Sequence, residues 1–312
     1  MAINNDCGQH AESTKFPDQV WRRKLRRQLL NWFRRNARDL PWRAAPTPYQ
    51  TWVSEIMLQQ TQVATVVEYY QRFLKRFPDI QTLATATEQE VLRYWEGLGY
   101  YRRARQLHLA AKTIMTNHHG CFPTTFPEVL ALPGIGRYTA GAILSISMGL
   151  RHPIVEANTI RLFARLLHVS TKVATVQTQT LFWEFAAWIL PHKHLSDFNQ
   201  ALMEVGSLIC TPKSPACDKC PLRTLCPTFV SQAFDKIPKP KQKTKLEQIQ
   251  EVAIVVQHRD GHRVLLRQCQ ADQRWAGLWD FPRFACDIKC SQELTTAEQQ
   301  QITQETHDLA DV

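Results

Sequence analysis

Hydrophobic residues recur every three or four positions through most of the chain, the spacing of helices that bury one face. From Pro48 to Asp235 this pattern continues, with Gly and Pro between the helical segments. Thr61 is the expected N-cap of a helix that runs from Val63 to Leu74. Further helices are expected over Glu88–Trp95, Arg102–Met115, Phe126–Leu132, Tyr138–Met148, Thr159–Leu167, Thr178–Leu190 and Ser196–Cys210. The pattern predicts a mainly α-helical protein.

The period changes near the C-terminus. Residues 236–243 are rich in Pro and Lys and are expected to form an extended linker. The β-branched runs Glu251–Gln257 and His262–Gln268 follow, on either side of Asp260-Gly261. An Asp-Gly pair between two such runs predicts a β-hairpin. A small domain that contains a sheet is therefore expected from about residue 249.

Composition makes this an ordinary globular chain of about two domains, with 312 residues, 44% hydrophobic and 21% charged. No run of eighteen apolar residues is present, which argues against a membrane span. The polar N-terminus lacks the apolar segment of a secretory signal, so we expect a protein that is not secreted, cytoplasmic and nucleoid-associated if bacterial.

The net charge of +10 favours a polyanionic partner. Eight arginines and one lysine lie between Trp21 and Arg43, on a segment whose apolar residues recur at helical spacing. This predicts an amphipathic helix with a cationic face. A merely solvated surface explains the local pattern about as well, and a membrane-surface helix is a further alternative.

Four of the nine cysteines are the strongest chemical signal, because they lie within seventeen residues at the spacing C-x6-C-x2-C-x5-C. Four thiolates can hold an iron–sulfur cluster or a zinc ion. Zinc sites usually pair two C-x2-C knuckles and only one is present, so the spacing favours a [4Fe–4S] cluster. The odd total of cysteines argues against disulfides and for a reducing compartment. The candidate ligands are Cys210, Cys217, Cys220 and Cys226.

Two glutamates are candidates for acid and anion in cleavage of a glycosidic bond. Glu55 has apolar neighbours, so burial would raise its pKa and keep it protonated. Glu156 precedes an expected helix that has Asn158 as its N-cap, and the helix dipole favours an ionised carboxylate there. An exposed Glu55 is about as compatible with the local pattern, and an ordinary helix-start charge is the simpler interpretation of Glu156.

Two glycine-containing loops favour nucleic-acid binding. Leu132-Pro133-Gly134-Ile135-Gly136-Arg137 joins two helices, and its glycines let backbone N–H groups meet a phosphate at a helix N-terminus. The segment Gly97–Arg105 offers tyrosines for stacking on bases and arginines for phosphates. A plain turn and helix packing are the respective alternatives.

Together these motifs resemble the MutY-type adenine DNA glycosylases of base-excision repair, over about residues 21–226. The matching strings are Leu40-Pro41-Trp42-Arg43, Ser54–Val63, Gly97-Leu98-Gly99-Tyr100-Tyr101, Leu132–Ala142, Phe198-Asn199-Gln200-Ala201 and the four cysteines.

The resemblance implies a helix-hairpin-helix glycosylase fold in which a six-helix barrel and a [4Fe–4S] helical domain flank a groove for bent DNA. The expected domains are a tail (1–20), a cluster domain (21–44 plus 150–228), the barrel (45–149, hairpin about 126–146), a linker (229–248) and a truncated α+β Nudix-like domain (249–312). The last assignment rests on residues 252–284. The acid-rich Nudix box is absent from the sequence, so no pyrophosphohydrolase activity is expected.

The resemblance also implies a monofunctional glycosylase, acting as a monomer on double-stranded DNA that holds adenine opposite 8-oxoguanine or guanine. Glu55 is the expected acid, and Tyr138 and Asn158 help to hold the second carboxylate and the sugar. Gln60 and Tyr100 are expected to wedge into the duplex, and Arg43, Gly134, Gly136 and Arg137 are the other expected DNA-binding residues. Tyr138 stands where endonuclease III-like relatives carry a Schiff-base lysine, which favours hydrolysis over lyase chemistry.

The sequence departs from the family pattern at the second carboxylate, where Glu156-Ala157-Asn158 replaces Asp-Gly-Asn. A longer side chain can displace the oxygen by about an ångström, which can cost about a hundredfold in rate. We expect Glu156 to serve with local adjustment. The alternatives are a non-catalytic mismatch-binding protein and an endonuclease III-like enzyme for another base.

Overall fold

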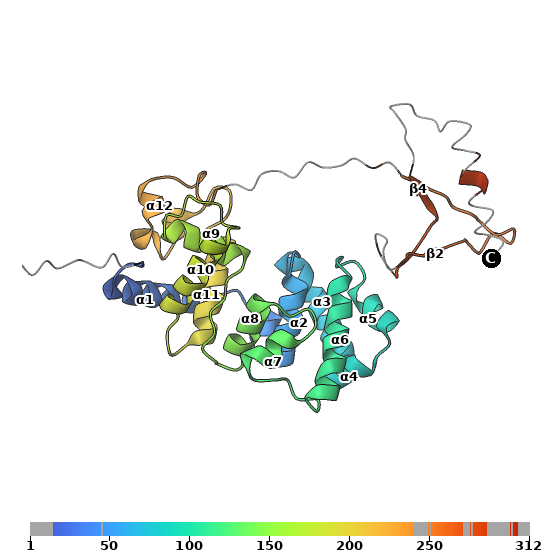
Figure 1. Ribbon diagram of the computed structural model, residues 1–312, viewed down its shortest axis with the longest axis horizontal. Coiled ribbons are helices and arrows are strands. Elements are labelled where there is room, and N and C mark those ends of the chain that lie inside the picture. Colours follow the sequence, from blue (N-terminus) through green and yellow to red (C-terminus); the bar gives the residue numbers. More distant parts are fainter. Residues whose placement is uncertain are drawn as a thin grey trace, which may run out of the picture. The chain divides into compact units, whose positions relative to one another are not determined.

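The computed structural model describes residues 15–44, 46–239, 249, 251–270, 275, 277–285, 300 and 302–304. Two compact units divide the chain, Met1–Lys241 and Gln242–Val312 (Figure 1). In the described part of the chain, no helix has the length and apolar character needed to cross a membrane.

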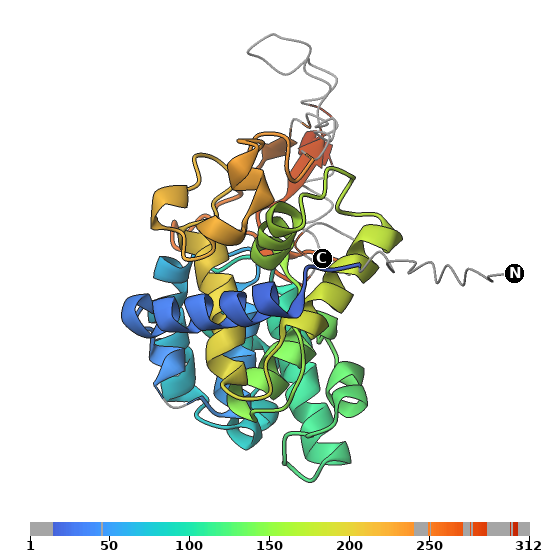
Figure 2. The same cartoon turned by 90° about the vertical axis from the view of Figure 1, so that its left-hand side faces the viewer.

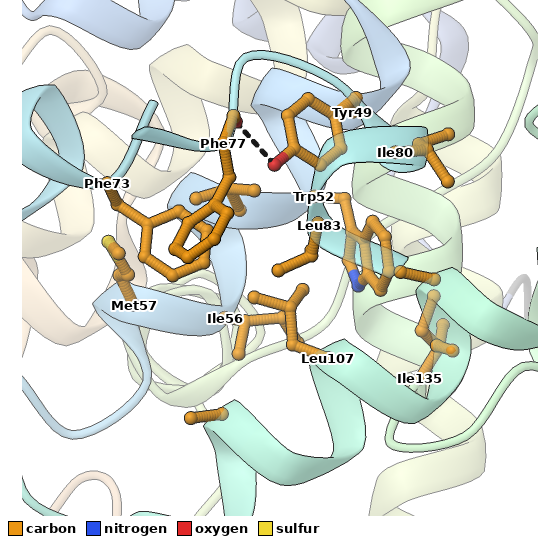
Figure 3. Packing of buried hydrophobic residues seen from close by; sticks show 14 of the residues in the cluster. Tyr49, Trp52, Ile56, Met57, Phe73, Phe77, Ile80, Leu83, Leu107 and Ile135 are labelled. Atoms are coloured by element: carbon orange, nitrogen blue, oxygen red, sulfur yellow. Dashed lines mark hydrogen bonds between the residues drawn. The ribbon is translucent and has the colours of Figure 1, made fainter. Parts of the chain in front are cut away.

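One hydrophobic core of the first unit is built by seven consecutive helices. They are α2 (Pro48–Leu58), α3 (Val63–Arg76), α4 (Ile80–Thr85), α5 (Glu88–Trp95), α6 (Arg102–Asn117), α7 (Phe126–Ala131) and α8 (Arg137–Ser147). Helix α2 lies at the centre, and eight of its eleven residues are buried, including the polar Ser54 and Glu55. Figure 3 shows its Trp52 and Ile56 among side chains of the neighbouring helices, with the Tyr49 hydroxyl donating to the Phe77 carbonyl.

A second core joins the N-terminal helix to helices that follow much later in the chain. Helix α1 (Gln19–Asn36) packs on α11 (Leu195–Leu208) and α10 (Val176–Ile189), as Figure 2 shows for α1 and α11. Helices α9 (Ala157–Leu166) and α12 (Pro227–Val230) and the short 3-10 turns Cys217–Lys219 and Arg223–Leu225 complete this part. A third 3-10 turn, Pro41–Arg43, leads from α1 towards α2.

The cationic character of α1 is partly structural. The guanidinium groups of Arg22 and Arg26 donate to backbone carbonyls at the C-terminus of α10, and Arg151 donates to two carbonyls of the same region. Positive charge at a helix C-terminus complements the dipole and satisfies unpaired carbonyls. Part of the arginine-rich segment therefore fastens α1 to α10 instead of facing a polyanion.

The prediction that Thr61 caps α3 is wrong. Gln62 occupies the N-cap position without a side-chain hydrogen bond, and the Thr61 hydroxyl donates to the Gln59 carbonyl. The turn that contains Thr61 folds back on the end of α2, which takes the hydroxyl away from the α3 amides.

The described residues of the second unit form four short strands, β1 (Glu251–Ala253), β2 (Arg267–Gln268), β3 (Trp279–Asp280) and β4 (Arg283–Ala285). Strand β1 pairs antiparallel with β4, and β2 with β3. Gln257 and Val264 form an antiparallel bridge across the Asp260-Gly261 turn, where the sequence predicts a hairpin. The regular strands are much shorter than the β-branched runs that predicted them.

Candidate active site and iron–sulfur pocket

A cavity of about 490 Å³ opens between the two cores of the first unit. Its wall comes from α2, α8, α11, the start of α9 and the segments before α2 and α3. Among the predicted site residues, it gathers Arg43, Glu55, Gln60, Tyr138, Glu156 and Asn158. The remaining predicted residues lie elsewhere on the first unit. Residues 55 and 156, far apart in sequence, thus face one space.

Glu55 is held in the wall by α2, and only 6% of its surface is exposed. The Tyr138 hydroxyl donates to its Oε2 at 2.5 Å. Burial raises the pKa of Glu55 to about 7, and the nearby Glu156 charge acts in the same direction, whereas the Tyr138 hydrogen bond and Arg43 lower the pKa. Near neutral pH the carboxyl is therefore able to hold and release a proton.

Tyr138 projects from the first turn of α8, and its oxygen also lies 3.2 Å from Met203 Sδ. Burial raises the pKa of the phenol well above its usual value, and the charges of Glu55 and Glu156 raise it further. The phenol therefore remains protonated and acts as a fixed hydrogen-bond donor.

Glu156 is the N-cap of α9, the position predicted for Asn158. Its Oε1 accepts from the Thr159 amide at 2.8 Å, and its Oε2 accepts from the Asn158 amide at 2.8 Å and the Asn158 side chain at 3.2 Å. Burial raises the pKa of Glu156, and these donors together with Arg161 oppose that rise. The Asn158 N-cap prediction is wrong because the longer Glu156 side chain reaches the free amides first.

Asn158 instead connects Glu156 with α11. Its Oδ1 accepts from Arg161, whose guanidinium also donates to the carbonyls of Gly206 and Cys210. A side chain on Gly206 would place its Cβ 2.7 Å from the Cβ of Asn158, so glycine is required for this close contact. The start of α9 is thereby fixed against the segment that carries the first cysteine.

A buried ion-pair network forms another part of the wall, and most of it is not predicted from the sequence. Glu204, 1% exposed, accepts from Arg38 and Arg43 through both carboxylate oxygens. Burial alone would raise the pKa of Glu204, but the two arginines hold it at about 2. Arg43 also donates to Gln200 at 2.9 Å, so its guanidinium is largely committed within the protein. An Arg-rich segment and a lone Glu in an apolar helix were the only sequence signals.

Gln60 and Tyr100 lie on two exposed turns, the first at the cavity and the second outside its wall. Both adopt left-handed backbone conformations, with φ of 58° and 50°. Tyr100 has 59% of its surface exposed.

The glycine loop between α7 and α8 has two different glycines. Gly134 has a φ of 75°, and a Cβ there would lie 2.6 Å from Gln106 Cβ, so both conformation and packing on α6 require glycine. Gly136 is the exposed N-cap of α8 and has open space around it. Arg137 follows it, and its guanidinium lies 3.9 Å from the centre of the Trp183 ring.

Cys210, Cys217, Cys220 and Cys226 line one small apolar pocket beside α9. Arg165, fully enclosed there, donates to Cys210 Sγ at 3.2 Å and to the Thr211 carbonyl at 2.8 Å. Burial raises the pKa of Cys220 to about 12, so ionised thiolates at this place require positive charge. Among the described residues, no group of three or more His, Cys, Asp or Glu side chains is placed to hold a single metal ion. Four thiols around one apolar pocket are a donor set that fits an iron–sulfur cluster.

Fold and cysteine pocket agree with comparisons to known proteins. Residues 53–187 match the HhH-GPD superfamily of base excision DNA repair proteins, and residues 210–226 match the iron-sulfur binding domain of endonuclease III. A thermostable thymine-DNA glycosylase structure superposes with a TM-score of 0.63 at 28% identity, covering 68% of this chain and 98% of that chain. An endonuclease III–DNA complex, with a TM-score of 0.57 and 19% identity, supports the fold alone. These matches define a helix-hairpin-helix DNA glycosylase with an iron–sulfur site.

The curated relatives are more specific. The adenine DNA glycosylase of Buchnera aphidicola (subsp. Schizaphis graminum) is 37% identical over 262 residues, covering 84% of this chain and 75% of the relative. The human adenine DNA glycosylase is 40% identical over 211 residues, which are 65% of this chain and 39% of the relative. The chain belongs to the adenine DNA glycosylase family, as its motifs predict.

Proposed function

We propose that the protein is a monofunctional glycosylase that hydrolyses the N-glycosidic bond of adenine opposite 8-oxoguanine or guanine in double-stranded DNA. The observation that carries the proposal is the pairing of Glu55 and Glu156 across one cavity of about 490 Å³. That volume lies within the range of pockets that enclose small ligands, and glycosidic hydrolysis uses two carboxyl groups. The adenine must leave the base stack to enter, at a cost of a few kcal/mol.

Glu55 is the proposed general acid. Its raised pKa leaves a proton available near pH 7, and Tyr138 fixes the carboxyl on one side. The proton passes to a ring nitrogen of adenine as the bond between the base and C1′ breaks. The base then leaves as neutral adenine, and the bonding electrons leave with it.

Glu156 is the proposed anion that stabilises the positive charge left on the sugar. Its oxygens accept from two backbone amides and the Asn158 side chain, which favours the ionised form. Water then adds to C1′ and loses its proton to a carboxylate, which leaves an abasic site. Glu204, Gln200 and the two arginines bond to one another and form a fixed polar part of the cavity wall.

DNA is proposed to be held by Gln60 and Tyr100 beside the opposite base and by the amides of the Gly134–Gly136 loop at a phosphate. Arg137 is exposed at the same helix start and is placed to add charge. Arg43 remains a proposed contact inside the cavity, not on the backbone, because Glu204 and Gln200 hold its guanidinium.

The iron–sulfur site is proposed to hold a [4Fe–4S] cluster on the four cysteines. When bound, the cluster supplies a rigid, charge-neutralising centre that folds the cysteine loop. Arg161 and Asn158 extend that rigidity to the start of α9. Iron and sulfide analysis of the purified protein, with its visible absorption, distinguishes four irons from two irons or zinc.

A glycosylase with lyase activity is an alternative, since a trapped endonuclease III–DNA covalent intermediate has a similar fold. Among the described residues around the cavity, none is lysine. Hydrolysis is therefore favoured over Schiff-base chemistry.

The test incubates the protein, in excess, with duplexes that carry adenine opposite 8-oxoguanine, guanine or cytosine, and with thymine opposite guanine. We expect alkali-dependent strand breaks at adenine in the first two, and no borohydride-trapped complex. Cleavage at thymine, or strand breaks without alkali, would contradict the proposal. Binding to the first duplex without adenine release would favour the non-catalytic alternative.

A further inference from the structure

Arg103, near the start of α6, lies between the turn after α2 and the Gly97–Tyr101 loop. Its guanidinium donates to groups on both of them. The acceptors are the carbonyls of Ile56, Met57, Gln59, Leu98 and Gly99 and the hydroxyl of Thr61. One side chain thereby joins the turn that carries Gln60 to the loop that carries Tyr100.

Both segments need such support. The last carbonyls of α2 have no partner within the helix, and Arg103 supplies donors and positive charge at this C-terminus. Gln60 and Tyr100, with positive φ, occupy conformations that side chains other than glycine disfavour. Surrounding contacts must therefore hold each turn in place.

The planar guanidinium is suited to this position. Its two terminal nitrogens face different acceptors, and its central carbon lies 5.4 Å from the ring centres of both Trp95 and Tyr100. Lysine would place a single ammonium there and could not bridge and stack in the same way. Arg103 is partly buried and committed to backbone carbonyls, which argues against a phosphate contact.

We propose that Arg103 is a positioning residue that holds Gln60 and Tyr100 in a fixed spatial relation and thereby sets the preference for the base opposite adenine. This rests on the proposed function. Arg103 does not itself line the cavity and bonds to neither carboxyl group, and it reaches the wall only through Gln59 and Thr61 of the turn after α2. It therefore acts through the two turns. Its loss should affect discrimination of the opposite base more than the chemical step.

The first experiment needs no DNA. Amide hydrogen exchange of the holoprotein is compared among wild type, Arg103→Met, Arg103→Lys and Arg93→Met, which removes an exposed arginine of α5. In both Arg103 variants, we expect exchange of residues 58–62 and 97–101 to accelerate about tenfold or more. Methionine has no donor, and the single ammonium of lysine cannot bridge the two turns. Arg93→Met should match wild type. Unchanged exchange in Arg103→Lys would contradict the proposal that Arg103 holds the two turns in place, whether or not the protein removes adenine.

The second experiment measures the affinity for duplexes with 8-oxoguanine or guanine opposite a non-cleavable adenine analogue. Arg103→Lys keeps the charge, and we expect it to reduce the affinity ratio between the two duplexes about tenfold. In a Gln60→Ala/Tyr100→Ala background, the same change should have no further effect on the affinity ratio, because the effects of substitutions at interacting residues do not add. An equal loss in both backgrounds would overturn the proposal. If wild type releases no adenine, the proposed function fails independently.

Discussion

Glu55 and Glu156 face the same cavity, yet the protein surrounds them differently. Glu55 sits within a buried helix and receives one hydrogen bond, from the Tyr138 phenol. Glu156 stands at the start of a helix and receives three N–H donors. Burial raises both pKa values and an arginine opposes the rise at each, but only Glu156 also accepts hydrogen bonds from backbone amides.

The contrast supports the proposed division of roles between an acid and an anion in one cavity. A carboxylate inside a helix finds no free amides, because the backbone donors are already used within the helix. A carboxylate at the N-cap meets the amides that the helix leaves unpaired. Position in the secondary structure therefore decides which carboxyl group meets backbone donors that favour its ionised form.

The largest effect is expected for removal of the acid. Glu55→Gln keeps the size of the side chain but provides no transferable proton. We expect the single-turnover rate of adenine release to fall by about 10³–10⁴-fold, in the upper range for general acid catalysis. Duplex affinity measured in parallel should change little. A rate within about tenfold of wild type would show that another group supplies the proton.

Removal of the anion should be the next largest effect. Glu156→Gln retains a carbonyl oxygen for the cap but cannot stabilise the sugar cation by charge, so we expect a loss of about 10²–10³-fold in the single-turnover rate. Glu156→Asp is the matched control, since aspartate is a strong N-cap residue and keeps the charge. Its shorter side chain can cost up to about a hundredfold in rate, but its rate should still exceed that of Glu156→Gln. Equal rates for Glu156→Gln and wild type would remove Glu156 from the mechanism.

The sequence predicted this pair of glutamates better than it predicted their surroundings. Apolar neighbours of Glu55 indicated burial, and the motif strings indicated the family, because both are local properties of the chain. The N-cap of α9 was predicted at the wrong residue. Asn158 has the stronger capping propensity, but the side chain of Glu156 reaches the free amides. Local preference does not include the reach of a neighbouring side chain.

Pairings between side chains far apart along the chain could not be predicted from the sequence. The ion pairs of Glu204 with Arg38 and Arg43 join segments more than 160 residues apart. Arg22 and Arg26 likewise belonged to a predicted cationic face, but they bond α10 carbonyls. Periodicity locates a residue on a helix face, whereas its partner depends on how the helices pack.

Replacement of Glu55 by glutamine should raise the stability of the folded protein, although it lowers the activity. The ordinary Glu55 pKa of 4.5 rises to about 7 in the folded protein, so the folded state loses stability as pH rises between these values. At about pH 8, ionisation of the buried Glu55 carboxyl destabilises the folded state by about 3 kcal/mol. Glu55→Gln removes it, so its free energy of unfolding should exceed that of wild type by about that amount at pH 8 and by much less at about pH 5. Urea unfolding at both pH values measures this. A constant difference would indicate an ordinary packing effect.

The smallest expected effect is a shift of the pH profile in Tyr138→Phe. Wild-type single-turnover rates should be highest below about pH 7 and fall above it, because the acid must be protonated. The Tyr138 hydrogen bond lowers the pKa of Glu55, so its removal should move the descending limb to higher pH. The maximal rate should change by less than about tenfold.

Tyr49→Phe is the matched control, since it removes a buried hydroxyl that bonds the Phe77 carbonyl away from the cavity. Its profile should coincide with that of wild type. A limb that stays in place in Tyr138→Phe, or moves to lower pH, would mean that the phenol does not stabilise the Glu55 carboxylate. The difference between the two carboxyl groups would then rest on burial and on the Glu156 cap alone.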